Sequence, residues 1–177
     1  GRIINERHFN RLRNILESDK EGLIYGGEYD EEEKYIAPSI IQVKDWNAAC
    51  MKEEIFGPIL PIMEYSDLNE VVNAINKQPK SLALYLFTSD KRVEKKVLNE
   101  ISSGGVSIND TILHLANSNL PFGGVGNAGM GAYHGEESFR TFSHRKSVLK
   151  KSRVLNTTLM YPPYSDKKLM VIKRFLK

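Results

Sequence analysis

The stretch EEIFGPILP, from Glu53 to Pro61, places two carboxylates, an aromatic ring and a Gly-Pro turn within a few residues. A carboxylate just before a tight turn is a good acceptor for two adjacent sugar hydroxyls, and an aromatic ring two residues later can press against a flat ring held by that sugar. Glu54 and Phe56 fit these roles. Alternatively, the two glutamates are an ordinary surface pair and Phe56 belongs to the core. Spacing alone does not decide between these interpretations.

A second chemical pattern is the run from Gly124 to Gly129, which has the G-x-G-x-x-G spacing of dinucleotide-binding loops. No strand-like segment precedes it, and the residues after it are a poor start for a helix, so the two features that give the motif its meaning are missing. We interpret these glycines as residues that let the backbone run close to another surface or to a ligand.

The remaining reactive side chains are isolated. Cys50 is the only thiol and has no cation or base nearby except Lys52, so we interpret it as structural rather than as a nucleophile. His114 and His134 could act as general bases, but single histidines are more often structural, and we favour that role for each. Neither a G-x-S-x-G nor an H-E-x-x-H motif occurs.

Composition limits the class of protein. The chain has 177 residues, of which 41% are hydrophobic and 27% charged, which is typical of one soluble globular domain or a piece of a larger one. A single cysteine excludes an internal disulfide and a multi-thiolate zinc site, and we expect no metal site. Without a membrane-spanning apolar run or the apolar centre of a secretory signal, the sequence predicts a cytoplasmic protein.

The C-terminal part of the chain is basic. From Arg140 to Lys177 there are eleven Lys or Arg residues and one acidic residue, Asp166. Such a tail can bind nucleic acid or an anionic membrane, but no helix-turn-helix or aromatic-lined basic groove accompanies it. We therefore favour a solvated segment or one that packs on a second subunit. For residues 169–176 we favour a packed terminal helix over contact with a membrane surface.

The elements that must position these residues follow from hydrophobic periodicity. Apolar residues at helical spacing predict an amphipathic helix from Asn5 to Ser18. From Ile59 the order is strand, helix, strand, helix, strand, which predicts an α/β fold with one parallel, helix-covered sheet. Its strands are expected at residues 59–65, 82–88 and 106–109, with helices starting after Asp67 and Asp90. Three such strands leave unpaired edges, so neighbours are expected beyond this segment and the chain looks incomplete.

Three ordered motifs carry a family resemblance: EEIFGPILP, LPFGGVGNAGMGAYHGEESFRTFSHRKSVL and MYPPY. Together they resemble the C-terminal part of the catalytic domain in the aldehyde dehydrogenase superfamily, most closely its class 3 branch, which acts on aromatic and long-chain aliphatic aldehydes. The likeness runs from about Gly1 to Tyr164. It implies a partial catalytic domain over residues 1–145, an oligomerisation strand in 146–160 and a tail over 161–177. The strand, expected at Ser147 to Arg153, would reach the partner in a homodimer.

The resemblance also implies roles for individual residues. Glu54 is similar to a glutamate that hydrogen-bonds the nicotinamide ribose of NAD or NADP, and Phe56 to its companion at the nicotinamide. Because the phosphate of NADP is on the other ribose, Glu54 cannot distinguish the two cofactors. Phe122 resembles a residue where nicotinamide and substrate meet. The aldehyde tunnel would be lined by Ile112, Leu115, Ala116 and His134.

The sequence departs from the family in length. Family members are about twice as long or longer, and neither their nucleophilic cysteine, which forms the thiohemiacetal, nor their general-base glutamate maps onto this chain. We therefore expect no catalytic residue here and no aldehyde oxidation by this polypeptide alone. An alternative function is a stand-alone, non-catalytic interaction module that keeps the fold and the dimer strand.

Overall fold

Helix α1 (Glu6–Ser18) begins as the sequence predicts. In the computed structural model, which describes residues 1–152 and 158–175, Asn5 is its N-cap and accepts a hydrogen bond from the backbone N–H of His8. Such a cap satisfies one of the free amides of the first helical turn. The helix buries Phe9, Leu12 and Leu16 on the one face that the periodicity indicated. The prediction of an amphipathic helix is confirmed.

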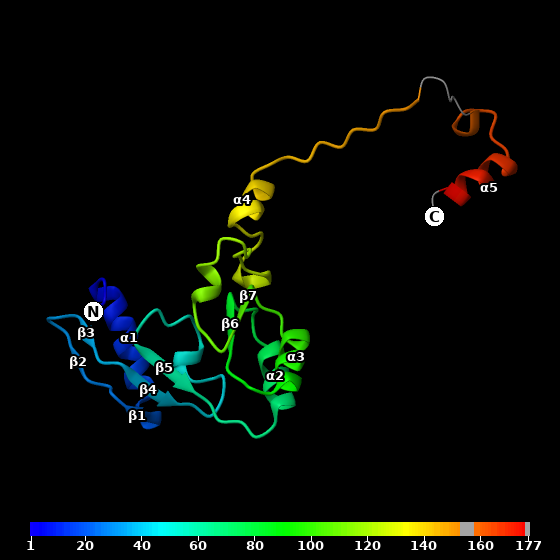
Figure 1. Cartoon of the computed structure of the whole chain (residues 1–177). Helices are drawn as coiled ribbons and strands as arrows, with labels where there is room; N and C mark the ends of the chain where they lie inside the picture. Colours follow the sequence, from blue (N-terminus) through cyan, green and yellow to red (C-terminus); the bar gives the residue numbers. More distant parts are fainter. Residues whose placement is uncertain (153–157, 176–177) are drawn as a thin grey trace.

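Helix α1 packs on a three-stranded sheet to form the first core (Figure 1). The strand order is β1-β4-β5, where β1 (Leu23–Tyr25) pairs antiparallel with β4 (Ser39–Gln42), and β4 pairs parallel with β5 (Ile59–Ile62). A separate hairpin joins β2 (Tyr29–Asp30) to β3 (Tyr35–Ile36). The buried residues of this core are Phe9, Leu12, Ile15, Leu16, Ile36, Ile41, Val43, Cys50 and Ile59.

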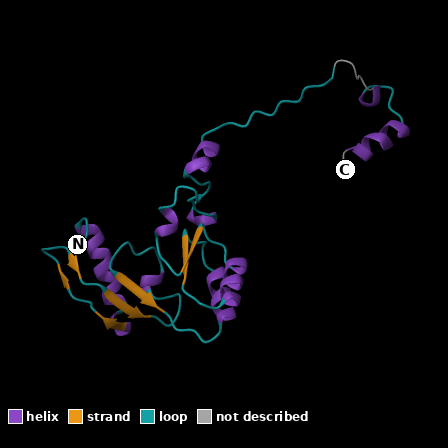
Figure 2. Ribbon diagram, viewed as in Figure 1, coloured by secondary structure: helices purple, strands orange, loops and turns teal. Residues whose placement is uncertain are grey.

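The second core consists of two helices on a two-stranded parallel sheet. Strand β6 (Ala83–Leu86) pairs with β7 (Gly105–Ile108), and helices α2 (Leu68–Asn76) and α3 (Lys91–Glu100) lie beside each other next to it (Figures 1 and 2). Asp67 and Asp90 cap the two helices, as the sequence predicted. Val72, Val97 and Ile101 are buried between helices and strands. Strand β6 is shorter and less buried than the expected segment 82–88.

The expectation of one sheet built from three consecutive strands is wrong. Strand β5 pairs with β4 of the first core, whereas β6 and β7 pair with each other in a second sheet. The reason is a competing partner: the apolar segment Ser39–Gln42 supplies a full parallel ladder to residues 59–62. The broader expectation, an α/β fold with parallel strands covered by helices, is confirmed.

Asp19 joins α1 to the segment that leads to EEIFGP. Its two carboxylate oxygens accept hydrogen bonds from the backbone N–H groups of Ala49 (3.0 Å) and Cys50 (2.8 Å), at the start of the single turn η2 (Ala49–Met51). Burial opposes ionisation of this carboxyl, but the hydrogen bonds from Cys50 and Ala49 prevail, so the pKa of Asp19 lies below its ordinary value of 3.8. The ionised carboxylate therefore stabilises the folded state.

We expect Asp19→Asn to lower the free energy of unfolding at neutral pH by about 1 kcal/mol, because an amide oxygen is a weaker cap than a carboxylate. A lowered pKa gives stability that is present above the unfolded-state pKa and is lost as the pH falls through the folded-state pKa. The difference between the parent and the variant should thus shrink as the pH falls below about 4. Urea unfolding over a pH series measures it; a difference that persists unchanged at acidic pH would contradict this assignment.

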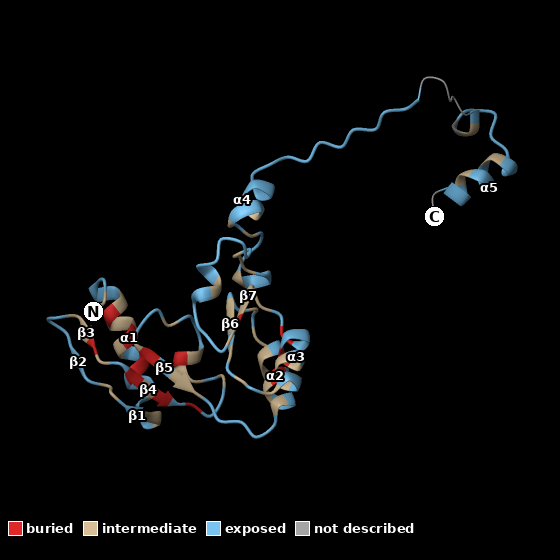
Figure 3. Ribbon diagram, viewed as in Figure 1, coloured by how far each residue is buried: buried red, intermediate tan, exposed pale blue. Residues whose placement is uncertain are grey.

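The C-terminal part extends away from both cores. After α4 (Gly135–Thr141), residues 143–152 form neither helix nor strand, and α5 (Asp166–Phe175) packs against the turn η5 (Thr158–Met160) (Figure 1). Figure 3 shows these residues as largely exposed, whereas the buried positions lie in the two cores. The expected terminal helix exists, and it packs against η5.

Residues 147–152 pair with no other strand within the described chain, and Arg153 lies outside the described residues, so the role of Ser147 to Arg153 in assembly stays a prediction. None of the described helices has both the length and the apolar composition needed to cross a membrane.

Candidate functional site

The EEIFGP segment lies between η2 and β5 at the surface of the first core. Glu54 is exposed, and it has no hydrogen bond or ion pair with any residue that the structure describes. Phe56 is 77% exposed, which contradicts the alternative interpretation that it belongs to the core. Its backbone has φ +46°, a left-handed conformation that is uncommon for a bulky residue. An exposed ring held at a strained backbone position is typical of a functional site.

The two glutamates of the segment have different surroundings. Glu53 forms an ion pair with Arg11 of α1, with 2.9 Å between Oε1 and Nη1. The same guanidinium donates a hydrogen bond to the carbonyl oxygen of Ile55. One carboxylate therefore connects the segment to α1, while the other is free to accept hydrogen bonds from a ligand.

Phe122 lies in a second group of residues, on the glycine-rich loop that follows β7. Its backbone exchanges two hydrogen bonds of 2.9 Å with Tyr133, and its ring stacks on His134 with 5.8 Å between ring centroids. A Cβ on Gly123 would lie 2.1 Å from the carbonyl oxygen of Gly131. The loop is thus folded tightly on itself, and Gly123 permits this close approach of two backbone segments. Close approach of the loop to a ligand stays a prediction.

The spacing Gly124 to Gly129 forms no dinucleotide loop. It contains the single turn η4 (Gly126–Ala128). Phe122, which precedes the run, forms only an isolated bridge with Tyr133, which follows it, rather than a strand. A helix does follow the loop, but it begins only at Gly135.

His134 and His114 both contact Phe122. The ring of His114 is 6.1 Å from that of Phe122 and 5.9 Å from that of Tyr85 on β6. Both ring nitrogens of His114, and Nδ1 of His134, are buried without a hydrogen-bond partner among the described residues. Buried polar atoms normally have partners, so these atoms are suited to meet a ligand or water. Sequence reasoning did not include His114 in the site, because its approach to Tyr85 depends on the loop path after β7.

Three of the four expected tunnel residues lie on the loop and turn that follow β7. Ile112 has φ +63°, which is unfavourable for a β-branched side chain, and is more than half exposed. Leu115 ends the turn η3 (Leu113–Leu115), and Ala116 follows it. Asn109 fixes the start of this loop, since its side chain both accepts from the N–H of Thr88 and donates to the carbonyl of Thr88.

The structure brings some of the predicted site residues together and not others. Phe122 and His134 are in direct ring contact. Among the residues described, no hydrogen bond, ion pair or ring contact joins Glu54 or Phe56 to this group. The candidate site therefore consists of two separate groups, one on each core.

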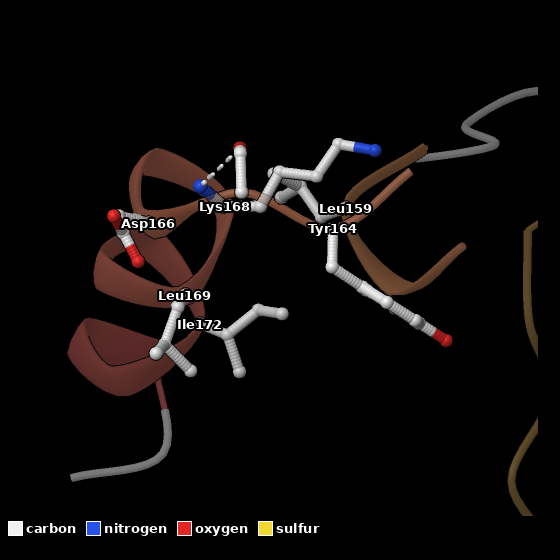
Figure 4. A pocket seen from close by; sticks show the side chains of 7 residues that line it. Leu159, Tyr164, Asp166, Lys168, Leu169 and Ile172 are labelled. Atoms are coloured by element: carbon white, nitrogen blue, oxygen red, sulfur yellow. Dashed lines mark hydrogen bonds between the residues drawn. The ribbon is translucent and has the colours of Figure 1, made fainter. Parts of the chain in front are cut away.

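Of two pockets on the surface of the described residues, one lies beside the EEIFGP segment and the other lies in the C-terminal part. One, of about 470 Å³, lies beside the second half of EEIFGP on the exposed face of the first sheet, and Tyr25, Ile40, Gly57, Pro58 and Leu60 contribute to its wall. The other, of about 300 Å³, lies between η5 and α5 (Figure 4). Its lining, Leu159, Tyr164, Ser165, Asp166, Lys168, Leu169 and Ile172, includes none of the predicted site residues.

Cys50 is poorly suited to nucleophilic chemistry in this structure. The side chain is only 2% exposed, and burial, together with the neighbouring carboxylate of Asp19, raises the pKa of its thiol to about 12. Almost no thiolate would exist at neutral pH. This agrees with the structural role that the sequence suggested.

The model of the aldehyde dehydrogenase family matches residues 1–148. Over 177 residues the chain is 49% identical to 4,4'-diaponeurosporen-aldehyde dehydrogenase of Staphylococcus aureus, covering 100% of this chain and 38% of that protein. It is also 49% identical to the dimeric NADP-preferring aldehyde dehydrogenase of Rattus norvegicus, over 92% of this chain and 36% of the relative.

A solved structure shows the same likeness in three dimensions. The aldehyde dehydrogenase of Mycobacterium tuberculosis complexed with NAD+ superposes with a TM-score of 0.76 at 29% identity. The match covers 85% of this chain and 32% of that one. The chain thus spans less than two fifths of the length of the relatives that it matches.

Proposed function

Because the chain belongs to the aldehyde dehydrogenase family, we propose that it contributes one part of the catalytic domain of an NAD(P)-dependent enzyme that oxidises aromatic or long-chain aliphatic aldehydes to carboxylic acids. Family membership confirms the resemblance read from EEIFGPILP and the two later motifs. The observation that carries the proposal is the pair formed by Glu54, a carboxylate without a partner among the described residues, and Phe56, an exposed ring on strained backbone.

These residues fit one wall of a cofactor site. Glu54 would accept hydrogen bonds from the nicotinamide ribose hydroxyls, and Phe56 would pack against the nicotinamide. When bound, NAD or NADP supplies the hydride acceptor for aldehyde oxidation. The names of the rat relative and of the Mycobacterium structure mention NADP and NAD+, respectively, which supports a nicotinamide cofactor without choosing between the two.

The second group would face the aldehyde. We propose that Phe122 lies where nicotinamide and substrate meet and that the tunnel is lined by Ile112, Leu115, Ala116 and His134. Apolar side chains on this loop suit hydrophobic aldehydes, because they remove apolar surface from water. We also propose that the complete protein is a cytoplasmic homodimer; the word "dimeric" in the name of the rat relative supports the assembly.

We expect the 177-residue polypeptide alone to produce no NADH or NADPH from an aldehyde. Its only thiol, Cys50, is buried with a pKa of about 12, so it supplies no thiolate for attack on the carbonyl. Absorbance of the reduced cofactor, with benzaldehyde or decanal as substrate, measures this. Reduced cofactor formed above a no-aldehyde blank would refute the expectation.

A chimaera tests the proposed function itself. In the Staphylococcus relative, the 177 residues that match would be replaced by this chain. The relative, which is 49% identical in the matched region, then supplies the rest of the domain. We expect the folded chimaera to oxidise benzaldehyde or decanal with NAD or NADP. A folded chimaera without activity on any of several aldehydes, beside an active Staphylococcus parent, would count against the proposal.

A further inference from the structure

Arg11 of helix α1 is bound to the EEIFGP segment at two points. Its Nη1 lies 2.9 Å from Oε1 of Glu53, and its Nη2 donates to the carbonyl oxygen of Ile55. The side chain of Arg11 is only 24% exposed, and its contact with the Ile55 carbonyl is partly shielded from water, whereas the Glu53 side chain is 56% exposed. Hydrogen bonds from a charged donor are stronger than neutral ones, and shielding increases this advantage. One guanidinium therefore holds two points of a segment more than forty residues away in the sequence.

The second contact restrains the peptide plane between Ile55 and Phe56. The carbonyl of Ile55 belongs to the peptide plane that leads into Phe56, and φ of Phe56 is the rotation of that residue relative to this plane. Phe56 has φ +46°, which is unfavourable for a residue with a bulky side chain. Such a conformation persists only when its surroundings impose it. The hydrogen bond from Arg11 is one such constraint.

Two further contacts hold the EEIFGP segment and the residues before it against α1. Leu12, the next residue of the helix, is fully buried and lies close to Gly57. A Cβ added to Gly57 would be 2.5 Å from Cδ2 of Leu12. Asp19, at the end of the helix, caps η2 ahead of the segment. Residues on both sides of Glu54 and Phe56 are thus anchored to a single rigid helix, while Glu54 itself has no partner within the described residues.

We propose that Arg11 is a positioning residue of the cofactor site, which fixes Glu53 and the Ile55 carbonyl so that Glu54 and Phe56 are presented to the cofactor. This inference rests on the proposed function. It assigns different tasks to the adjacent carboxylates: Glu53 holds the segment on α1, and Glu54 binds the ribose. Arg11 touches neither the cofactor nor the substrate; it acts through the segment.

The matched control is Arg13 on the same helix. It forms an ion pair with Glu31 in the turn between β2 and β3, which we call the acidic hairpin because it carries Glu31, Glu32 and Glu33. The distance between Nη1 and Oε2 is 3.2 Å, and the side chain of Arg13 is 29% exposed. Arg13→Ala therefore removes a similar charge and a similar ion pair from α1 without touching EEIFGP. Arg11→Lys keeps the charge but has one point donor in place of the planar fork, so it can replace only part of the two contacts.

The first measurement uses the 177-residue chain and a protease that cleaves after glutamate, with the fragments identified by mass spectrometry. We expect Arg11→Ala to raise the rate of cleavage after Glu53 and Glu54 about tenfold, because the segment opens more often once it is released. Arg13→Ala should instead raise cleavage in the hairpin at Glu31. Equal rates after Glu54 in the two variants would overturn the inference.

The second measurement uses the chimaera with the Staphylococcus relative. We expect Arg11→Ala to raise KM for the nicotinamide cofactor about tenfold while kcat changes by less than about threefold, since cofactor binding is weakened and the chemical step is not. Arg11→Lys should recover part of the loss, and Arg13→Ala should behave like the parent chimaera. The Arg11→Ala and Glu53→Gln effects should be less than additive in the double variant, because both break the same ion pair.

The outcomes separate the two proposals. An active chimaera whose cofactor KM is the same for Arg11→Ala and Arg13→Ala overturns the positioning role and leaves the proposed function intact. A folded but inactive parent chimaera counts against the proposed function, and the cleavage rates of the 177-residue chain then decide whether Arg11 holds the segment.

Discussion

Gly104→Ala is expected to lower the free energy of unfolding of the second core by about 3 kcal/mol, at the upper end of the cost of overpacking. A Cβ at this position would lie 2.3 Å from the carbonyl oxygen of Gly123 and 2.6 Å from that of Leu82. Both atoms belong to backbone, which cannot rotate away as the end of a side chain can. The two strand ends and the glycine-rich loop would have to separate, which would also displace Phe122.

Gly105→Ala is the matched control for this prediction. It adds the same methyl group one residue later, where the nearest atoms, at 2.8 and 3.0 Å, belong to the ring of His114. The ring of His114 is a side chain, which can shift more readily than backbone although it packs on Tyr85 and Phe122. We therefore expect a loss of stability of no more than about 1 kcal/mol, because the lower entropy of the unfolded chain offsets part of the cost of moving the ring. Urea denaturation of the two variants measures the difference. Equal stabilities would show that the loop does not pack on β7 as described.

Glu54→Gln in the chimaera is expected to weaken cofactor binding about tenfold, because an uncharged amide replaces the carboxylate that accepts from the ribose hydroxyls. NAD and NADP should lose affinity by the same factor, since the phosphate that distinguishes them is on the other ribose. Glu32→Gln, in the exposed acidic hairpin, removes the same charge far from EEIFGP and should have no effect. Isothermal titration calorimetry with NAD and with NADP gives the dissociation constants. Losses of less than about twofold for Glu54→Gln, or a loss for NADP alone, would contradict the ribose contact.

Local features of the fold could be read from the sequence because neighbouring residues determine them. Asn5, Asp67 and Asp90 are helix caps, and each depends on a side chain and an amide two or three positions apart. The pairing of β5 could not be predicted in this way. It depends on whether Ser39–Gln42 or a later strand pairs with residues 59–62, and both candidates are short apolar segments that the sequence pattern does not distinguish.

In the candidate site, too, neighbouring residues could be identified from the sequence, whereas contacts between distant residues could not. Glu54 and Phe56 could be identified because they are adjacent in one motif, and the likeness to a known family gave the motif its meaning. Arg11 could not, because it reaches Glu53 and Ile55 across more than forty residues of chain. The positive φ of Phe56 likewise has no signature in its residue type, since glycine is the residue that favours such a conformation.

The most direct test of the account is the distance between the Glu54 carboxylate and the ribose hydroxyls in a crystal structure of the chimaera with bound NAD or NADP. We predict that both hydroxyls of the nicotinamide ribose lie within hydrogen-bond distance, about 2.5–3.0 Å, of the Glu54 carboxylate, with the Phe56 ring against the nicotinamide end. A bound cofactor whose nicotinamide ribose is held by other residues, with Glu54 still in solvent, would contradict it.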